Sequence, residues 1–168
     1  MKTLYLIRHA KADLKNGEVA DLYRPLNERG YSDAAKMSRT LKDKKVMPQL
    51  VITSPAIRTY STAIVFCNTL DYDTSTIMLA PGLYESSAKE YLHVISEIDN
   101  ECDCAFLVGH KPTITDCANR LTKPFTEEIP TCGIIGLKST ATDWKQFVKF
   151  PNELFLYDYP KNNSLLAR

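Results

Sequence analysis

Short apolar runs alternate with longer amphipathic segments along most of the chain. The strand-like runs, rich in β-branched and aliphatic side chains, are residues 3–7, 50–53, 76–79 and 104–108. The segments between them repeat apolar residues at helical spacing and cover residues 31–44, 55–70, 88–98 and 111–121. Further β-like runs are residues 133–137, 146–150 and 153–157. The pattern predicts four strand–helix units followed by a β-rich end.

This order of elements predicts an α/β fold. Successive parallel strands joined by helices give a mainly parallel central sheet with helices on both faces, which is a three-layer sandwich. The final strands predict an antiparallel edge strand. No linker, repeat or low-complexity segment divides the chain, so its 168 residues are expected to form a single domain over residues 1–168.

Local signals indicate where some of the helices start. Ser54 stands before a proline and is expected to cap the second helix. Ser87, with Glu90 three positions later, forms a capping-box pattern for the third helix. Asp143 and Trp144 are expected at the turn between the two β-like runs that follow the fourth helix.

A long polar stretch separates the first strand from the first helix. Residues 12–29 carry few apolar side chains and are interrupted by Arg24-Pro25. The stretch is longer than the usual connection in a compact domain, and loops of this length are often functional.

Composition argues against several classes of protein. The formal net charge is +1, so no overall field attracts nucleic acid or a membrane, and no run of eighteen apolar residues predicts a transmembrane helix. The short apolar run at the N-terminus is followed by charges, unlike a signal peptide. Five cysteines, an odd number, predict reduced thiols and a cytoplasmic location. Cys102 and Cys104 lack the spacing of a zinc site, and no cofactor is expected.

Cations and histidines follow three of the predicted strands. The first strand ends in Arg8 and His9, the fourth is followed by His110, and Arg58 lies in the first helical turn after the second. The carboxyl ends of parallel strands meet at one edge of a sheet, so these side chains are expected to converge there with two helix N-termini. Arginine forks and helix N-termini both bind phosphate oxygens. Each residue taken singly could be structural, but together they predict a phosphoryl pocket that needs no metal.

The same residues match the motifs of a known family. They are Arg8-His9-Ala10, Ser54-Pro55 with Arg58, Gly109-His110 and the polar stretch 21–30. This set resembles the histidine phosphatase (phosphoglycerate-mutase-like) superfamily, and most of all its small SixA-type phosphohistidine phosphatases, over residues 2–137. Ala10 departs from the glycine that is usual in the superfamily, although alanine is common in this branch. The large insertions that roof the site in the mutases are absent, which implies an open site for a phosphorylated side chain or a small phosphoester.

The resemblance implies a role for each residue. His9 would be the nucleophile and become phosphohistidine, while Arg8, Arg58 and His110 would hold the phosphate oxygens. Glu85, after the third strand, matches the position where many relatives keep a proton donor. The two guanidinium groups should also disfavour imidazolium, which would keep His9 neutral for attack.

Three further cations lie near these motifs. Lys11 could touch the edge of the same anion, as a phosphate-binding residue, or simply lie on the surface. Arg24 and Arg29 match the branch pattern, and we expect them to tie the long loop down by charge pairing rather than contact the substrate.

Several functions compete on this basis. The leading hypothesis is a metal-independent phosphatase that works through phospho-His9 on phosphohistidine proteins. A phosphomonoesterase for small metabolites is the nearest alternative, and Glu85 favours it because an ester needs a proton donor more than a phosphoramidate does. A non-catalytic module that reads phosphorylated partners would need the arginines but no nucleophile. A metal-dependent hydrolase is disfavoured because carboxylates are not clustered, and the oligomeric state stays open.

Overall fold

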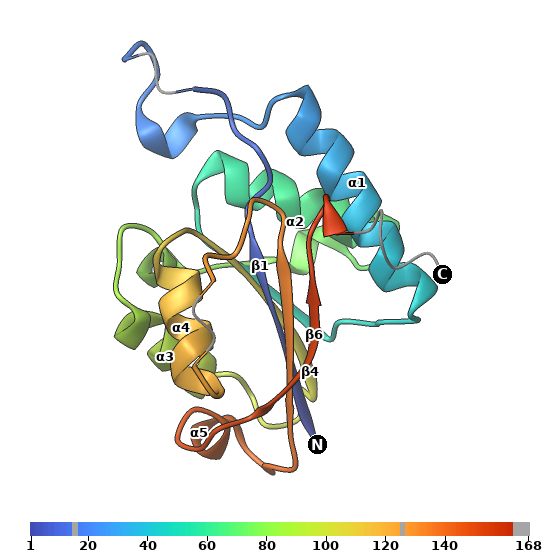
Figure 1. Cartoon of the computed structure of the whole chain (residues 1–168), viewed down its shortest axis with the longest axis vertical. Coiled ribbons are helices and arrows are strands. Elements are labelled where there is room, and N and C mark those ends of the chain that lie inside the picture. The colour runs from blue at the N-terminus through green and yellow to red at the C-terminus, as the bar shows by residue number, and fades with distance from the viewer. Residues whose placement is uncertain (15–16, 125–126, 163–168) are drawn as a thin grey trace.

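Six strands form one mixed sheet in the computed structural model, which describes residues 1–14, 17–124 and 127–162 (Figure 1). The strands are β1 (Lys2–Arg8), β2 (Leu50–Thr53), β3 (Met78–Leu79), β4 (Cys104–Gly109), β5 (Ile134–Ser139) and β6 (Glu153–Asp158). Their order across the sheet is β3-β2-β4-β1-β5-β6. The first four run parallel, whereas β5 is antiparallel to β1 and β6 is antiparallel to β5. The predicted parallel sheet with an antiparallel edge is confirmed.

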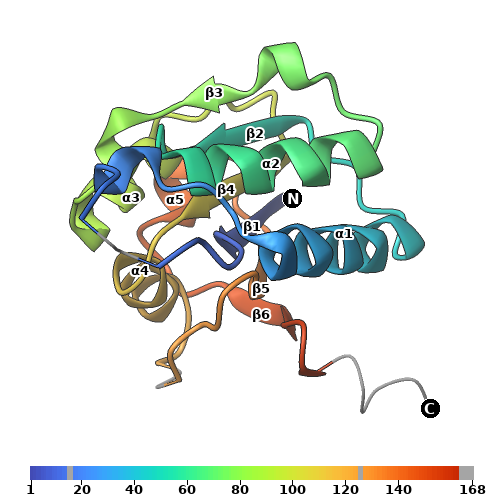
Figure 2. The same cartoon turned by 90° about the horizontal axis from the view of Figure 1, so that it is seen from above.

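Helices cover both faces of this sheet, as Figure 2 shows. They are α1 (Glu28–Asp43), α2 (Ile57–Thr69), α3 (Ala88–Ser96), α4 (Thr113–Leu121) and α5 (Trp144–Phe147), with short 3₁₀ turns at Asp21–Tyr23, Thr74–Thr76 and Pro81–Leu83. α1 and α2 pack on one face, and α3, α4 and α5 pack on the other. The predicted three-layer α/β sandwich is therefore confirmed.

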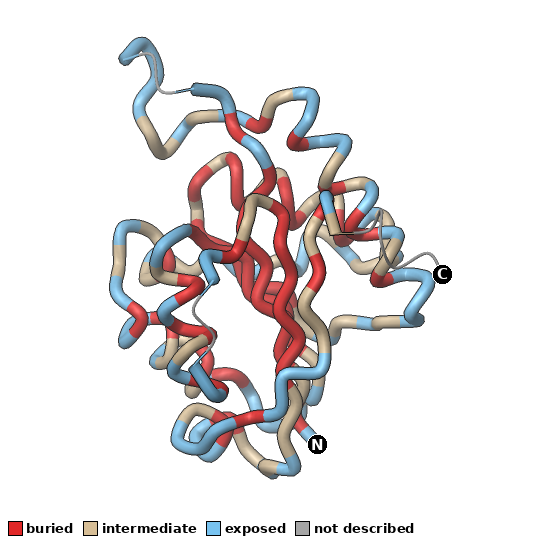
Figure 3. Tube along the Cα trace, in the orientation of Figure 1, coloured by how far each residue is buried: buried red, intermediate tan, exposed pale blue. Residues whose placement is uncertain are grey.

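Side-chain alternation along β1 builds the core on both faces. Leu4 and Leu6 join the cluster under α3, α4 and α5, whereas Tyr5 and Ile7 join the cluster under α1 and α2. These strand residues are buried, and the buried strands run through the centre of Figure 3. Burying a leucine or isoleucine stabilises the fold by roughly 1.5–3 kcal/mol before entropy is counted. β1 is thus held on both faces and both edges, which fixes the residues at its carboxyl end.

The segment between β5 and β6 differs from its prediction. The predicted strand at 146–150 is wrong, because the chain forms α5 up to Phe147 and a turn over residues 148–150. Asp143 is not at a turn between strands but caps this helix, accepting the Gln146 N–H at 2.7 Å. Trp144 and Phe147 are both fully buried, with ring centroids 5.1 Å apart. Burial at a spacing of three residues outweighs the β propensity of the run, and the last predicted strand is confirmed as β6.

Capping residues set the start of two helices. α1 begins at Glu28, earlier than predicted, because the side-chain oxygen of Asn27 accepts the Gly30 N–H at 2.9 Å. Ser87 caps α3 as predicted, and its hydroxyl accepts the Glu90 N–H at 3.4 Å. Asn27, in the polar stretch before α1, is the sequence signal for the start of that helix.

The long polar stretch 12–29 is folded back on itself through one antiparallel β-bridge. Arg24 holds the stretch together, since its guanidinium donates to the Asp13 carbonyl at 2.6 Å and to Asp21 Oδ1 at 3.0 Å. This is the anchoring role predicted for Arg24. Residues 15 and 16 of the predicted loop lie outside the described residues.

No helix within the described residues is both long enough and apolar enough to cross a bilayer. All five cysteines are free thiols. Burial raises the pKa of Cys67 and of Cys117 to about 12, so these two thiols stay protonated at neutral pH.

Asn152 joins the segment before β6 to the ends of α4 and α5. Its amide donates to the main-chain oxygens of Leu121, Phe147 and Phe150 at 2.8, 3.0 and 3.1 Å. We expect Asn152→Ala to lower the free energy of unfolding by about 1–3 kcal/mol in urea denaturation, because these oxygens lose a buried donor. The control Gln146→Ala, on the exposed surface of α5, should change it by less than about 0.5 kcal/mol. Equal effects of the two substitutions would contradict this role.

Candidate active site

Four of the predicted residues line one pocket of about 400 Å³ at the carboxyl edge of the parallel strands. Arg8 ends β1 and His9 follows it, Arg58 lies in the first turn of α2, and His110 follows β4. Their exposed fractions are 7, 8, 6 and 8%, so all four are buried. Arg8 lies opposite Gly109 in the β1–β4 ladder, which brings the rings of His9 and His110 to a centroid separation of 5.4 Å.

Main-chain contacts fix both the position and the tautomer of His9. Its N–H donates to the Gly109 carbonyl at 3.0 Å, and its carbonyl accepts the Cys132 N–H at 3.1 Å. The ring Nδ1 lies 2.7 Å from the Ala10 carbonyl oxygen. A carbonyl can only accept, so we assign the ring proton to Nδ1, which leaves the lone pair on Nε2. The ring is therefore held in the form that can act as a nucleophile at Nε2.

Burial and neighbouring positive charge keep His9 neutral. Desolvation lowers the pKa of His9 most, and the hydrogen bond to Ala10 opposes this only in part. His110, Arg58 and Arg8 lower it further, to about 3. At neutral pH the imidazole therefore keeps its lone pair, as the pattern of cations predicts.

His110 is held by a serine rather than by a charged group. Ser54 Oγ lies 2.8 Å from Nε2 of His110 and also accepts the Ala56 N–H at 3.3 Å. The N-cap position of α2 is Ala56 and has no side-chain cap, so the prediction that Ser54 caps this helix is wrong. Extended backbone after β2 leaves Ser54 ahead of the helix, beside the histidine. Burial first, and then the Arg58 charge, lower the pKa of His110 to about 4.

A close approach of Tyr91 explains the glycine before His110. The Tyr91 hydroxyl accepts the His110 N–H at 3.0 Å and donates to the Leu83 carbonyl at 3.0 Å. A Cβ at Gly109 would overlap the Tyr91 ring, so only glycine fits this end of β4. Tyr91 of α3 therefore fixes the position of the main chain at His110. The sequence analysis did not predict this contact.

The two arginines are each held on one side by acceptors of the protein. Arg8 donates through Nη1 to the Ile129 carbonyl at 2.6 Å and to Glu128 at 3.1 Å. Arg58 donates to the carbonyl and the carboxylate of Asp21 at 2.7 and 3.0 Å. The Nε atoms of both are buried without a partner among the described residues. Two buried guanidinium groups with incomplete hydrogen bonding are costly in a purely structural role, and they give the pocket its positive charge.

Asp21, in the long loop, is a site residue that the sequence analysis missed. Besides Arg58 and Arg24, the Tyr84 hydroxyl donates to its carboxylate at 3.0 Å. Partial desolvation opposes ionisation, but the hydrogen bonds from Tyr84, Arg58 and Arg24 outweigh it and hold the pKa of Asp21 well below its usual range. An acid in a polar loop carries no local signal for a partner on α2, so only the folded chain reveals this pairing.

Lys11 and Glu85, the two other predicted site residues, line different pockets. Lys11 is exposed and lines the same pocket as Arg8 and His9. Glu85 is exposed, has a positive φ of 47°, and lines an adjoining hollow that also touches Arg58 and His110. The structure therefore brings Lys11, but not Glu85, into the pocket of the four buried residues.

The surroundings of the pocket are mostly loop residues. α2 contributes Arg58 from its first turn, but no residue of α4 lines the pocket, so only one of the two helices expected to reach the pocket contributes a lining residue. Exposed side chains at its edge include Asp13, Leu14 and Lys111. Within the described part of the chain, no three His, Cys, Asp or Glu side chains are grouped so that they could hold a metal ion.

Comparison with known proteins connects this geometry to a family. The family model described as histidine phosphatase superfamily (branch 1) matches residues 4–114. A curated relative, an uncharacterized chloroplastic protein of Arabidopsis thaliana, is 24% identical over 153 residues, which cover 86% of this chain and 70% of the relative.

Solved structures share the fold at low sequence identity. A protein histidine phosphatase SixA complexed with tungstate has a TM-score of 0.83 and 21% identity, with 96% of this chain and 99% of that chain covered. A mycobacterial glucosyl-3-phosphoglycerate phosphatase has a TM-score of 0.72 and 15% identity, with 94% and 99% covered. These similarities establish a common fold.

The lowered histidine pKa values predict how stability depends on pH. His9 and His110 titrate near 3 and 4 in the folded chain, below the ordinary value of 6.5, so protonation favours the unfolded chain. The contribution of each to stability is complete above about pH 6.5 and is lost progressively as the pH falls towards the folded-state value. In urea unfolding, the loss of stability between about pH 7 and pH 5 should be smaller for His110→Asn than for the wild type. The matched control is His93→Asn, on the exposed surface of α3; identical slopes for His110→Asn and the wild type would contradict the assignment.

Proposed function

The chain belongs to the histidine phosphatase superfamily, and we propose that it is a metal-independent phosphatase that removes the phosphoryl group from phosphohistidine on a protein. One observation carries the proposal. His9 has its Nδ1 on the Ala10 carbonyl, which leaves the lone pair on Nε2, and it lines a pocket together with Arg8, Arg58 and His110. This is the arrangement that a nucleophilic histidine needs beside a phosphoryl group.

In the first step, the Nε2 lone pair of His9 attacks phosphorus and the phosphorus–nitrogen bond of the substrate breaks. The leaving imidazole takes a proton from solvent, while the phosphoryl oxygens rest against Arg8, Arg58 and His110. Transfer of this kind needs alignment and charge stabilisation rather than further covalent chemistry. Since β1 and α2 hold these groups before substrate arrives, little reorganisation is required.

In the second step, water attacks the phosphorus of phospho-His9 and releases inorganic phosphate. The bond that breaks is the same kind of phosphorus–nitrogen bond as in the first step, so the same groups serve both. Imidazole leaves without a strong acid, whereas the predicted proton donor that an ester would need, Glu85, lies in the adjoining hollow.

The surroundings of the pocket favour a phosphorylated side chain on a protein. Its edge is formed by exposed residues such as Lys11, Asp13 and Lys111 rather than by a covering domain. A histidine on the surface of another protein could therefore reach His9. The SixA structure with bound tungstate, a tetrahedral oxyanion like phosphate, supports the placement of an anion in this fold.

A small-molecule phosphomonoesterase is the second candidate. Glu85 lines a hollow that also touches Arg58 and His110, from which a proton donor could serve an ester leaving group. The mycobacterial phosphatase that shares this fold is named for a small phosphorylated substrate, glucosyl-3-phosphoglycerate. A non-catalytic phosphate-binding module is less well supported, because binding alone requires no neutral histidine beside the arginines.

Labelling with a phosphodonor tests the nucleophile. After brief incubation with a phosphohistidine protein and rapid denaturation, we expect an acid-labile, base-stable label on wild-type protein and none on His9→Ala. Turnover by His9→Ala should fall by at least about 10³-fold, because no covalent intermediate can form. His93→Ala, which removes an exposed histidine of α3, should label like the wild type. Turnover that survives in His9→Ala would overturn the proposal.

Replacing Glu85 separates the two substrate classes. With EDTA present, a phosphohistidine protein and an aryl phosphate are assayed in parallel with the wild type and Glu85→Gln. We expect the variant to lose about tenfold or more in kcat on the aryl phosphate and to change little on phosphohistidine, because only the ester needs a donor. Equal loss on both substrates would rule out this use of Glu85. Glu90→Gln, at an exposed position of α3, is the matched control.

A further inference from the structure

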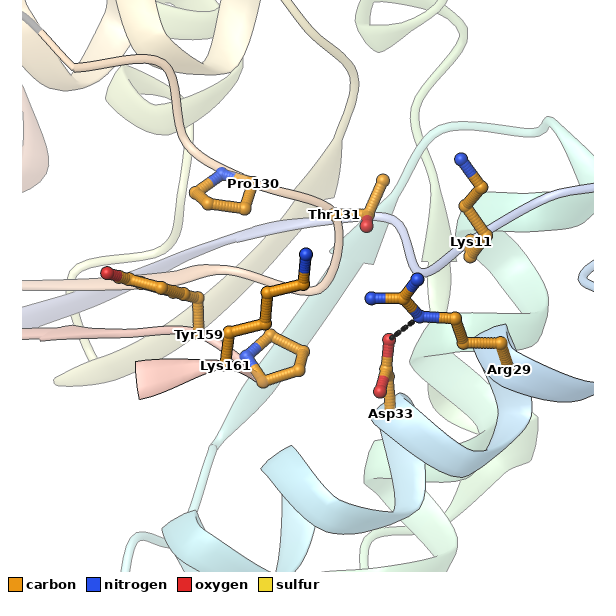
Figure 4. Close-up of a pocket in the computed structure, with 8 residues that line it drawn as sticks. Lys11, Arg29, Asp33, Pro130, Thr131, Tyr159 and Lys161 are labelled. Atoms are coloured by element: carbon orange, nitrogen blue, oxygen red, sulfur yellow. Dashed lines mark ion pairs between the residues drawn. The ribbon is translucent and has the colours of Figure 1, made fainter. Parts of the chain in front are cut away.

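A second pocket of about 340 Å³ adjoins the first (Figure 4). Four separate segments build it: the residues after β1, the first turns of α1, the loop before β5 and the segment after β6. Its lining residues are Lys11, Arg29, Asp33, Pro130, Thr131, Tyr159, Pro160 and Lys161. Lys11 and Thr131 line both pockets, so the second is reached directly from the phosphoryl site.

The second pocket carries more positive than negative charge. Among the described residues that line it, Lys11, Arg29 and Lys161 are the cations and Asp33 is the one acid. Figure 4 shows the guanidinium of Arg29 between the amino groups of Lys11 and Lys161. Asp33 pairs with Nε of Arg29 at 3.6 Å, on one edge of the guanidinium. The sequence predicts that Arg29 ties the long loop down, but its ion pair lies within α1 instead.

Hydrogen bonds to main-chain carbonyls hold the walls of this pocket together. The Asn27 N–H donates to the Lys11 carbonyl at 3.0 Å, and a Cβ at Gly30 would collide with that same carbonyl. Glycine at this position lets the first turn of α1 approach the strand end, which sets Arg29 beside Lys11. On the other side, Lys36 of α1 donates to the Pro160 carbonyl at 2.7 Å and so holds the segment after β6 against the helix.

The third wall is joined to the nucleophile itself. Thr131 lies in the loop whose next residue, Cys132, donates its N–H to the His9 carbonyl at 3.1 Å. The Arg8 N–H also donates to the Gly133 carbonyl at 3.0 Å, so main-chain hydrogen bonds to the end of β1 set the position of this wall relative to His9. A group attached to the phosphorylated residue would meet the second pocket when the phosphoryl group lies against His9.

We propose that this basic pocket binds a carboxylate side chain that neighbours the phosphohistidine in the protein substrate. The inference rests on the proposed phosphatase function and specifies its substrate: segments in which acidic residues flank the phosphorylated histidine. Arginine presents a planar fork that matches a carboxylate, and lysine adds charge without fixed geometry. Asp33 already uses one edge of Arg29, so the pocket suits one incoming carboxylate better than a second phosphate with its larger charge.

Two matched phosphohistidine peptides test the inference. One carries glutamates beside the phosphohistidine, and the other carries glutamines at the same positions. For the wild type, we expect kcat/KM to be about tenfold higher on the acidic peptide, mainly through KM, and the ratio to shrink as ionic strength rises. In Arg29→Gln with Lys161→Gln the ratio should fall towards one. Arg39→Gln with Lys44→Gln, which also removes two positive charges but from exposed positions in and just after α1, should keep the wild-type ratio.

The outcomes separate this inference from the proposed function. Turnover of both peptides with equal kcat/KM, or a preference that persists in the double variant, would overturn the basic pocket and leave the phosphatase standing. No turnover of either peptide, with aryl phosphate still hydrolysed, would overturn both. A preference for carboxylate-bearing over plain aryl phosphate, with no preference between the peptides, would assign the carboxylate to a small molecule and refute a protein source.

Discussion

The hydrogen bond from Nδ1 of His9 to the Ala10 carbonyl is the interaction on which the rest of the site depends. It decides which ring nitrogen keeps a lone pair, and it requires a fixed position of the main chain just after β1. The N–H of Ala10 donates to the Thr62 hydroxyl at 3.0 Å, and that hydroxyl donates to the Arg58 carbonyl at 2.7 Å. One short chain of hydrogen bonds thus couples the tautomer of His9 to the turn of α2 that presents Arg58.

The same geometry is unfavourable for folding. Two histidines and two arginines lie buried in one place, where burial disfavours the charged forms and like charges repel. The protein answers in two ways. The histidines remain neutral, and each guanidinium is partly satisfied, Arg8 by the Ile129 carbonyl and Arg58 by Asp21. The large apolar core on both faces of β1 offsets the unfavourable free energy of burying these groups.

The parts of the site that lie at strand ends could be predicted from the sequence, because a parallel ladder has a regular geometry. In the β1–β4 ladder Arg8 lies opposite Gly109, and His9 and His110 follow side by side. Asp21 could not be predicted, since its partners are brought to it by a loop with no periodic pattern.

The errors have physical causes of the same kind. Serine is a preferred residue type at helix N-caps, yet the extended backbone before α2 places Ser54 beside His110 instead. The strand predicted at 146–150 became a helix because Trp144 and Phe147 bury best on one helical face. In both cases a tertiary contact, invisible in a single window of sequence, outweighed a sound local preference.

Asp21 has a consequence for turnover as well as for architecture. Its carboxylate pairs with Nη2 of Arg58 at 3.0 Å, so an anion bound to that guanidinium shares it with a fixed negative charge. Free phosphate carries more negative charge than a phosphoryl group during its transfer, and is repelled more strongly by this carboxylate. The pocket is therefore expected to hold its product less tightly than its positive lining suggests, which favours release after each cycle.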